Sequence, residues 1–456
     1  MDIQSLILEA SRKAEEETQN IGEPEFTQKI EWPVSCTVGP GLEGAIACES
    51  AVGYVNGTAG KLLYRGYNIF DLCAYSSYEE VSFLLLHGYL PEKKELEEYK
   101  RRLITYRSAQ KTIRQLAASG IEGLNDMAAL RLGILFLRQK VTVTDTVEGR
   151  PSITTAISAD EDSIPMEKFP TGEERAIYEF TRKEQDSELL KEDSLHACYH
   201  LIAAMPTIVA AVYRLREGKK PLEPDPELGH AANFLYMFTG KKPSELEAKI
   251  MDAALILHAD HGMNASTFAT MVVASTLSDI YFSVGSGIAA LNGPLHGGAN
   301  EDVIRTLKEI GRPDRVKSWL AEKLAAGQKI PGFGHRVYKA YDPRARVLGP
   351  LAARLAEENP EARKLYEVAA ELEKEVIQRL GAKKKVFPNV DFYSGLVYLS
   401  LGIEPHAYTP IFAVSRVAGW TARTLEYLKN NRIFRPRAVY TGPFDCQYIP
   451  LAERGK

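Results

Sequence analysis

Three histidines lie near one another in the middle of the chain, next to glycines and prolines. His258 and His261 occur in L-H-A-D-H-G, and His296 follows in G-P-L-H-G-G. Apolar residues at helical spacing precede the first pair, whereas the glycines and the proline around His296 end any helix there. The pattern predicts imidazoles on tight turns at helix ends, where they can bind an anion or polarise a carbonyl group.

A second glycine-rich segment, P-G-F-G-H-R-V-Y-K, carries His335 directly after its last glycine and continues into Y-D-P-R. Lys339 and Arg344 belong to the cluster of cations in this stretch. A glycine-rich turn leaves backbone amides and carbonyls open to a ligand, and arginine and lysine bind carboxylates or phosphates. The segment therefore predicts a site for an acidic substrate.

Two further residues complete the set of reactive groups. Asp391, in P-N-V-D-F-Y-S-G, stands at the start of an apolar helical pattern, where a carboxylate serves either as a base or as the N-cap. Arg416 interrupts another apolar helix, and a buried arginine requires an anionic partner that the neighbouring sequence does not supply. A carboxylate, uncharged histidine donors and several cations are the groups needed to remove a proton next to a carbonyl of an acidic substrate.

Taken in order, the motifs of this chain resemble those of the citrate synthase family. The resemblance covers roughly 39–100 and 196–445 and rests on G-L-E-G, Y-R-G-Y, L-H-A-D-H-G-M-N-A-S-T, G-P-L-H-G-G-A-N, P-G-F-G-H-R-V-Y-K-x-Y-D-P-R, P-N-V-D-F-Y-S-G and R-P-R. It implies condensation of acetyl-CoA with oxaloacetate and water to citrate and CoA, by enolisation of the thioester, aldol-type attack and hydrolysis. The alternative is 2-methylcitrate synthase, which uses propionyl-CoA.

The resemblance also implies a role for each reactive residue. His296 would donate a hydrogen bond to the thioester carbonyl, Asp391 would remove the methyl proton, and His335 would polarise the ketone of oxaloacetate. The residues implied to bind oxaloacetate are His261, Arg344, Arg416 and Arg435, the last contributed by the other subunit of a homodimer. The residues implied to contact CoA are Lys329, Ile330, Pro331, Gly332, Phe333, Gly334, Lys339 and Lys383. No metal and no cofactor besides the substrates is implied.

The elements that must hold these residues are almost all helices. Residues 45–67 contain two short apolar runs around Asn56-Gly57, which predict a small β-hairpin. Beyond them the apolar spacing predicts an all-α protein. The predicted helices are 78–88, 92–107, 124–139, 171–190, 194–217, 228–238, 244–260, 264–278, 280–291, 299–310, 315–326, 343–358, 360–381, 391–401 and 408–430. Many breaks between them coincide with proline or glycine, and Pro206 is counted among these breaks.

The family resemblance predicts a two-domain helical fold. Its parts are an N-terminal arm over 1–38, a large domain over 39–298 and 397–456, and a small domain over 299–396 that closes over the site. The chain departs from the family pattern in its long arm and in segment 108–195. There the usual His-Pro-Met is replaced by Asn125-Asp126-Met127. We read 140–170 as a loop excursion.

Composition sets the remaining expectations. The 456-residue chain has a formal net charge of −4, which argues against a nucleic-acid-binding protein. Its five scattered cysteines form no C-x-x-C pair and are typical of reduced thiols. No uninterrupted apolar run reaches the length of a membrane span, and the acidic N-terminal helix is unlike a targeting peptide. We therefore expect a cytoplasmic protein with no membrane partner.

Each motif also has an alternative interpretation, either structural or as a different kind of site. Taken singly, His296 reads as a turn histidine and Asp391 as an N-cap, so that a non-catalytic helical assembly protein is one alternative. His258, Asp260 and His261 contain metal-ligand types, which suggests a metal hydrolase, although their spacing differs from that of helical zinc sites. Residues 285–290 imitate a dinucleotide fingerprint without the β-α-β setting that such a site requires.

Overall fold

The computed structural model describes residues 2–18, 27, 29–138, 146–147, 150–151 and 189–454. The predicted helix 171–190, except its last two residues, and most of the predicted excursion 140–170 lie outside the described residues. The α-helices are α1 Ile3–Thr18, α2 Ile69–Tyr75, α3 Tyr78–His87, α4 Lys93–Tyr106, α5 Gln110–Ala118, α6 Asp126–Arg138, α7 Leu189–Arg216, α8 His230–Thr239, α9 Glu245–His258, α10 Ala265–Ser275, α11 Ile280–Leu291, α12 Ala299–Ile310, α13 Val316–Ala325, α14 Pro343–Ala356, α15 Pro360–Val376, α16 Ala382–Lys384, α17 Val390–Ser400 and α18 Tyr408–Leu428. The strands are β1 Gly53–Asn56, β2 Lys61–Tyr64, β3 Tyr67–Asn68, β4 Thr146–Val147 and β5 Arg150–Pro151. The all-α prediction is confirmed.

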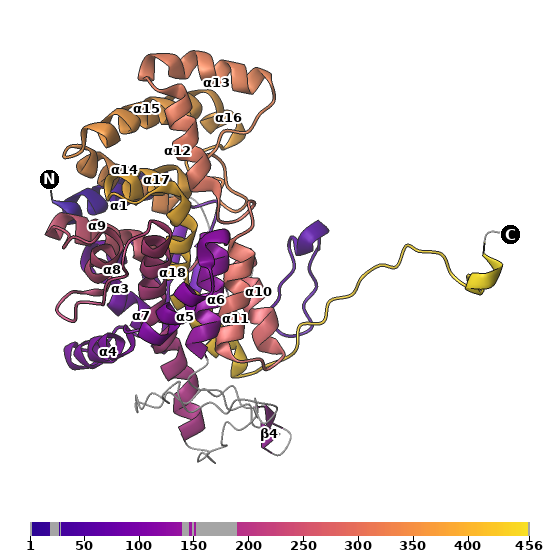
Figure 1. Ribbon diagram of the computed structural model, residues 1–456. Coiled ribbons are helices and arrows are strands. Elements are labelled where there is room, and N and C mark those ends of the chain that lie inside the picture. The colour runs from indigo at the N-terminus through magenta and orange to yellow at the C-terminus, as the bar shows by residue number, and fades with distance from the viewer. Residues whose placement is uncertain are drawn as a thin grey trace.

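Helix α18 lies at the centre of the molecule. Every residue from 408 to 424 is buried, and the helix packs against α3, α7, α9, α10 and α11 (Figure 1). A helix that is apolar on all faces can be stable only when neighbours surround it completely. Arg416 and Arg423 are the two charged side chains in this buried stretch.

The helices α12 to α17 form the upper group in Figure 1. Within it α14 packs against α15 and α17, and α12 packs against α17. Helix α14 also contacts α2 and α9 in the body of the molecule. These helices run from 299 to 400, whereas the predicted small domain is 299–396, and its division from the remainder stays a prediction.

The predicted N-terminal arm begins with a packed helix. Ile7 and Ala10 of α1 are buried, and α1 lies against both α2 and α14. Glu17, near its end, pairs with Arg346 of α14. The first part of the arm therefore connects the body to the upper group of helices.

The predicted hairpin is present, and a short third strand extends it. Strands β1 and β2 pair antiparallel from Gly53↔Tyr64 to Asn56↔Lys61, and β3 pairs with β2. At the turn, the Asn56 side chain accepts hydrogen bonds from the amides of Thr58 (3.1 Å) and Ala59 (2.9 Å). Short polar side chains that bond their own backbone in this way are what favours a turn at Asn-Gly.

Most predicted helices occur within a few residues of their expected bounds, with three differences. Helices α2, α5 and α16 were not predicted, because short helices show too few apolar repeats. The predicted break at Pro206 is wrong, since this proline lies inside α7. Proline removes one helical hydrogen bond and crowds the preceding turn, and the burial of every residue from 197 to 213 outweighs that cost. The predicted helix 360–381 ends instead in a π-helical turn, Ile377–Gly381.

One stretch of α7, Leu195–Arg216, is apolar and long enough to cross a membrane by length and composition. In the structure, 89% of the most apolar 18-residue stretch of this helix is buried inside the protein, so the helix forms part of the core.

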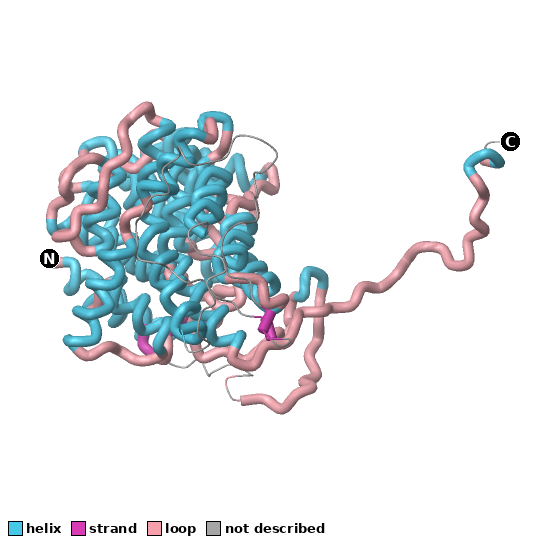
Figure 2. Tube along the Cα trace, turned by 60° about the horizontal axis from the view of Figure 1, so that its bottom comes forward, coloured by secondary structure: helices cyan, strands magenta, loops and turns pink. Residues whose placement is uncertain are grey.

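The chain leaves the body after α18. Phe434 is the last anchored residue of this segment, with its ring stacked on Tyr427 (centroids 4.9 Å apart) and its amide donating to the Ser275 hydroxyl. From Arg435 the chain runs as an exposed tail away from the helices (Figure 2).

Candidate active site

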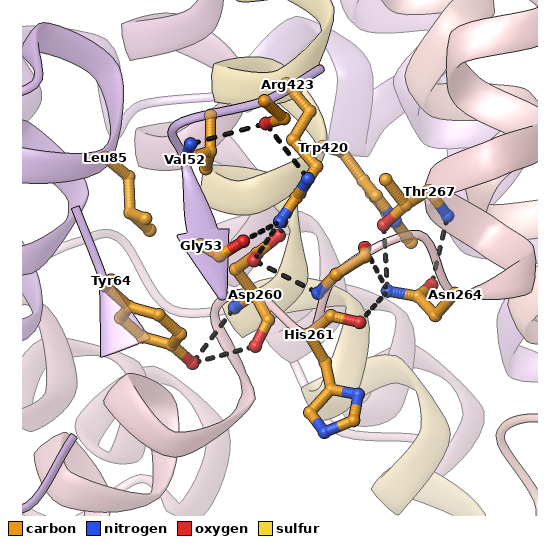
Figure 3. A network of polar contacts seen from close by, with 12 residues as sticks. Val52, Gly53, Tyr64, Leu85, Asp260, His261, Asn264, Thr267, Trp420 and Arg423 are labelled. Atoms are coloured by element: carbon orange, nitrogen blue, oxygen red, sulfur yellow. Dashed lines mark hydrogen bonds and ion pairs between the residues drawn. The ribbon is translucent and has the colours of Figure 1, made fainter. Parts of the chain in front are cut away.

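His261 lies in the turn between α9 and α10, and the residue before it holds this turn. The Asp260 carboxylate is fully buried and pairs with Arg423 of α18 through two hydrogen bonds of 2.7 and 2.8 Å. The Tyr64 hydroxyl accepts from the Asp260 amide and donates to the Asp260 carbonyl. In Figure 3 the imidazole of His261 points away from this network.

His296 lies on the tight turn between α11 and α12. Its Nε2 accepts a hydrogen bond from the Ser266 amide (3.2 Å) and lies 2.8 Å from the Ser266 hydroxyl. Because an amide can only donate, the ring hydrogen is on Nδ1. Burial, followed by the charge of Arg416, lowers the pKa of His296 to about 4. His296 is therefore an uncharged hydrogen-bond donor at neutral pH.

His335 carries its ring hydrogen on the opposite nitrogen from His296. Its Nδ1 accepts from the amides of Val337 (3.0 Å) and Tyr338 (3.1 Å), so the ring hydrogen is on Nε2. Burial lowers its pKa to about 4, and the charge of Arg344 acts in the same direction. The ring centroids of His335 and His261 are 5.3 Å apart, and the Tyr338 hydroxyl lies 3.1 Å from Nε2 of His261. The two predicted motifs thus meet in space.

Arg344 and Asp342 form a buried pair at the start of α14. Asp342 caps this helix and holds the Arg344 guanidinium by hydrogen bonds of 3.0 and 2.8 Å. The same carboxylate accepts from the Val390 amide (3.2 Å), which ties α14 to the segment that carries Asp391. Burial alone would lower the pKa of Arg344, but the Asp342 carboxylate raises it above its ordinary value.

Arg416 is 1% exposed, and among the described residues no carboxylate forms an ion pair with it, although the charge of Asp260 acts on it from a distance. Its Nε donates to the His258 carbonyl, and the guanidinium lies 4.6 Å from the centre of the Phe412 ring. One terminal nitrogen is buried with no hydrogen-bond partner among the described residues. Burial lowers the pKa of Arg416 to about 10. The anionic partner that the sequence required is not supplied by the described part of the chain, which leaves that place for a substrate carboxylate.

Asp391 lies in the first turn of α17, and Asn389 occupies the N-cap position. Its side chain therefore does not cap the helix. Within the described residues the carboxylate has no hydrogen bond or ion pair. Burial raises its pKa to about 6, while the charges of Arg344 and Arg416 limit the rise. This is the value expected of a carboxylate base that works near neutral pH.

The electrostatic effects of the two arginines link the site residues. The charge of Arg416 acts on His261, His296 and Asp391. The charge of Arg344 acts on His261, Asp391 and also on His335. Arg344 and Arg416, two of the three arginines predicted to bind oxaloacetate, therefore lie within electrostatic range of these histidines and of Asp391.

The predicted CoA segment 329–334 is fastened beside Asp391. Gly334 donates to the Phe387 carbonyl and Asn389 donates to the Gly332 carbonyl, each at 2.9 Å. Gly332 has φ +78°, and an added Cβ would lie 2.8 Å from the Phe392 side chain, so only glycine fits. The other predicted contacts divide by burial: Ile330 is buried, Pro331 and Phe333 are half-buried, and Lys329, Lys339 and Lys383 are exposed.

This chain does not bring the predicted oxaloacetate residue Arg435 to the site. It is exposed at the start of the tail, where its guanidinium donates to the Pro436 carbonyl at 3.4 Å. Whether it joins the site of a second chain stays a prediction.

The geometry argues against two alternative sites, a metal site at His258, Asp260 and His261 and a dinucleotide site at 285–290. Both Asp260 oxygens face the Arg423 guanidinium, and His258 Nδ1 lies 2.7 Å from the Ala254 carbonyl. In the described part of the chain no group of three or more metal-ligating side chains could hold a metal ion. The imitation of a dinucleotide fingerprint lies inside α11, where Gly287 lets that helix approach Thr270 of α10.

Sequence reasoning did not assign roles to several residues that position the site. Ser266 follows His261 in the same motif, and Asp342 precedes Arg344 in Y-D-P-R, so both could have been identified from their motifs. Arg423 is different, because its partner Asp260 is distant in the sequence and only the position of Arg423 in the same apolar helix as Arg416 marked it.

The comparisons with known proteins agree with this geometry. Residues 41–437 match the family model described as the citrate synthase C-terminal domain. Citrate synthase from Haloferax volcanii is 41% identical over 416 residues, covering 91% of this chain and 98% of that one. The crystal structure of citrate synthase from Pyrobaculum aerophilum is 40% identical, with a TM-score of 0.77 over 94% of this chain and all of that one.

A third relative was solved with ligands. Citrate synthase from Thermoplasma acidophilum, in a ternary complex with carboxymethyl coenzyme A and oxaloacetate, is 33% identical, with a TM-score of 0.77 over 92% of this chain and 100% of that one. A match of this extent in sequence and fold identifies the family. The chain belongs to the citrate synthase family.

Proposed function

We propose that this protein condenses acetyl-CoA with oxaloacetate and water to give citrate and CoA. Membership of the citrate synthase family supports the reaction. One observation carries the assignment of roles: an unpaired carboxyl with a pKa of about 6 shares a site with two uncharged histidine donors and two buried arginines.

The first step is removal of a methyl proton from acetyl-CoA by Asp391. The α-proton of a thioester is weakly acidic, so the carboxylate can remove it only if the forming enolate is stabilised. The Nδ1–H of His296 is fixed by Ser266 as a neutral donor and serves the thioester oxygen. A neutral donor stabilises the enolate without a permanent charge that would also bind competing anions.

The second step is attack of the enolate carbon on the ketone of oxaloacetate. The Nε2–H of His335 donates to the ketone oxygen and then protonates the alkoxide. Arg344, Arg416 and His261 bind the oxaloacetate carboxylates, and the buried unpaired nitrogen of Arg416 supplies one of these bonds. Water then cleaves the citryl thioester, which releases citrate and CoA.

We further propose that CoA lies along 329–334, with the exposed Lys339 and Lys383 near its phosphates. The reaction then requires acetyl-CoA, oxaloacetate and water, with no additional cofactor. The five cysteines are unpaired thiols, which supports a reducing, cytoplasmic location.

The active unit in this proposal is a homodimer in which Arg435 completes the oxaloacetate site of the partner. The support is the tail itself, since a lone chain would expose a series of large apolar side chains along it. These are Val439, Tyr440, Phe444, Tyr448, Ile449 and Leu451. Ending the chain after Phe434 should give a monomer in sedimentation and a large rise in KM for oxaloacetate. A truncated chain that remains a fully active dimer would contradict both parts.

The test of the reaction is thiol release from acetyl-CoA, with and without oxaloacetate, repeated with propionyl-CoA. Release that depends on oxaloacetate and favours acetyl-CoA is the expected result. A higher kcat/KM for propionyl-CoA would reassign the protein as a 2-methylcitrate synthase with the same residues in the same roles, because one methylene is worth only about 1–3 kcal/mol in a pocket. No release with either thioester would overturn the proposal.

A further inference from the structure

The two halves of the oxaloacetate site come from distant segments, and one small element touches both. His261 belongs to the turn after α9, whereas His335 belongs to the loop before α14. The ketone and the carboxylates of one small substrate must contact both halves at once. A misplacement of about 1 Å in such a site can cost about 10²-fold in rate. Something must therefore fix the spacing of the two segments.

The first attachment is the Arg423 guanidinium, which bridges the His261 turn and strand β1 (Figure 3). It holds the Asp260 carboxylate at 2.7 and 2.8 Å and donates to the Gly53 carbonyl at 3.2 Å. Its third nitrogen donates to the Ser50 hydroxyl at 3.1 Å. The fit is close, because a Cβ on Gly53 would lie 2.5 Å from the Asp260 carboxylate.

The second attachment is at the other end of β1. The Gly57 carbonyl accepts hydrogen bonds from the amides of Lys339 (2.8 Å) and Ala340 (3.3 Å). A Cβ on Gly57 would lie 2.1 Å from the Val337 carbonyl oxygen, so the turn rests directly on the loop backbone. This is the same backbone whose amides, at Val337 and Tyr338, hold Nδ1 of His335.

We propose that the β1–β2 hairpin is a spacer that sets the position of His335 relative to His261, with Arg423 and Gly57 as its two positioning residues. Its four backbone pairs and the buried Asn56 make it short and stiff. The hairpin contacts no reacting atom and acts only through the two histidines. This inference rests on the proposed function, because it assigns the spacing to the binding of oxaloacetate.

The test uses Gly57→Ala in the full-length protein, with Gly123→Ala as the matched control. A methyl group at Gly57 must displace the Val337 carbonyl, whereas a Cβ at Gly123 meets nothing within 4 Å. Oxaloacetate affinity is measured by calorimetry, and kcat and both KM values by thiol release. The expected result for Gly57→Ala is a loss of roughly 10- to 100-fold in kcat/KM for oxaloacetate, with weaker oxaloacetate binding and a smaller change in KM for acetyl-CoA, because Lys339 of the displaced loop also belongs to the proposed CoA site.

Arg423→Lys provides the second variant if Gly57→Ala does not fold. Lysine keeps the charge opposite Asp260, but its single ammonium cannot reproduce the planar fork that reaches Asp260 and Gly53 together. It should change KM for oxaloacetate and not KM for acetyl-CoA. A purely structural role predicts a lower Tm with both KM values unchanged, or both changed alike, and either result would overturn the inference.

The experiment distinguishes a failure of the spacer proposal from a failure of the proposed reaction. If the unaltered protein releases no CoA, the reaction is wrong, and calorimetry with oxaloacetate still decides whether Gly57→Ala weakens binding relative to Gly123→Ala. If the unaltered protein is active and Gly57→Ala matches Gly123→Ala in every constant, the spacer is wrong and the reaction stands.

Discussion

The raised pKa of Asp391 predicts that this residue reduces the stability of the folded protein. Its pKa is about 6 in the folded protein, compared with an ordinary value of 3.8. The folded state therefore binds the proton more tightly than the unfolded chain, and ionising Asp391 costs stability. The cost is absent below pH 3.8, grows between pH 3.8 and 6, and is complete above pH 6.

The size of this cost follows from the gap between the two pKa values. At about 1.36 kcal/mol per pH unit, the gap corresponds to at most about 3 kcal/mol at pH 8. At pH 5 the same relation leaves roughly half of that value. Replacing Asp391 with the uncharged amide of similar shape removes the ionisation cost, so Asp391→Asn should be more stable than the unaltered protein by these amounts.

The assay is denaturant or thermal unfolding at pH 5 and pH 8, without substrates. Glu97→Gln on α4 is the control, because Glu97 is exposed and neutralising it should change the unfolding free energy by no more than about 0.5 kcal/mol. Asp391→Asn should also lose oxaloacetate-dependent CoA release. An Asn variant that is less stable at pH 8, or whose advantage is the same at both pH values, would refute the reasoning.

Three further predictions concern the surrounding groups. His296→Ala and Asp391→Ala should each lose most turnover with an unchanged circular dichroism spectrum, and a near-normal kcat in either would contradict the assigned roles. Asp342→Asn leaves the buried charge of Arg344 without its partner, which should lower stability by about 3–5 kcal/mol and raise KM for oxaloacetate; an unchanged Tm would show that the pair is not needed. The hydrogen bond that the His406 ring donates to the Asp126 carboxylate raises the pKa of His406, so this pair stabilises the fold fully below the ordinary value of 6.5 and loses its effect as the pH rises through the higher folded value. His406→Gln should therefore lower Tm at pH 6 and not at pH 9, and an equal loss at both pH values would argue for a packing role.

The site was more predictable from the sequence than the scaffold around it. The glycines and prolines beside His296 and His335 fix where helices must end, so the placement of both rings on turns could be inferred locally. An arginine without a nearby acidic residue in an apolar helix likewise predicted that Arg416 binds an anionic ligand. Each of these signals lies within a few neighbouring residues.

The pairings that hold the site were not predictable in the same way. Asp260 finds Arg423, and Gly57 meets Lys339, only after the chain has folded, and no local pattern encodes either contact. Helix α1 shows the same limit, because its amphipathic spacing predicted a helix without indicating that α2 and α14 would bury it. Nor did periodicity identify the short helices α2 and α5, since they contain too few turns to repeat a pattern.

Helix α18 belongs both to the buried core and to the candidate active site. Residues 408–424 are all buried, and Arg416 and Arg423 project from the same stretch. A larger or smaller side chain in this stretch would shift the helix and both guanidinium groups with it, because close-packed interiors transmit such changes. Selection for heat tolerance or a new substrate therefore has little freedom to vary this helix. Adaptive substitutions should accumulate in peripheral elements such as α4 and α13, where the chain can change its stability without changing its catalyst.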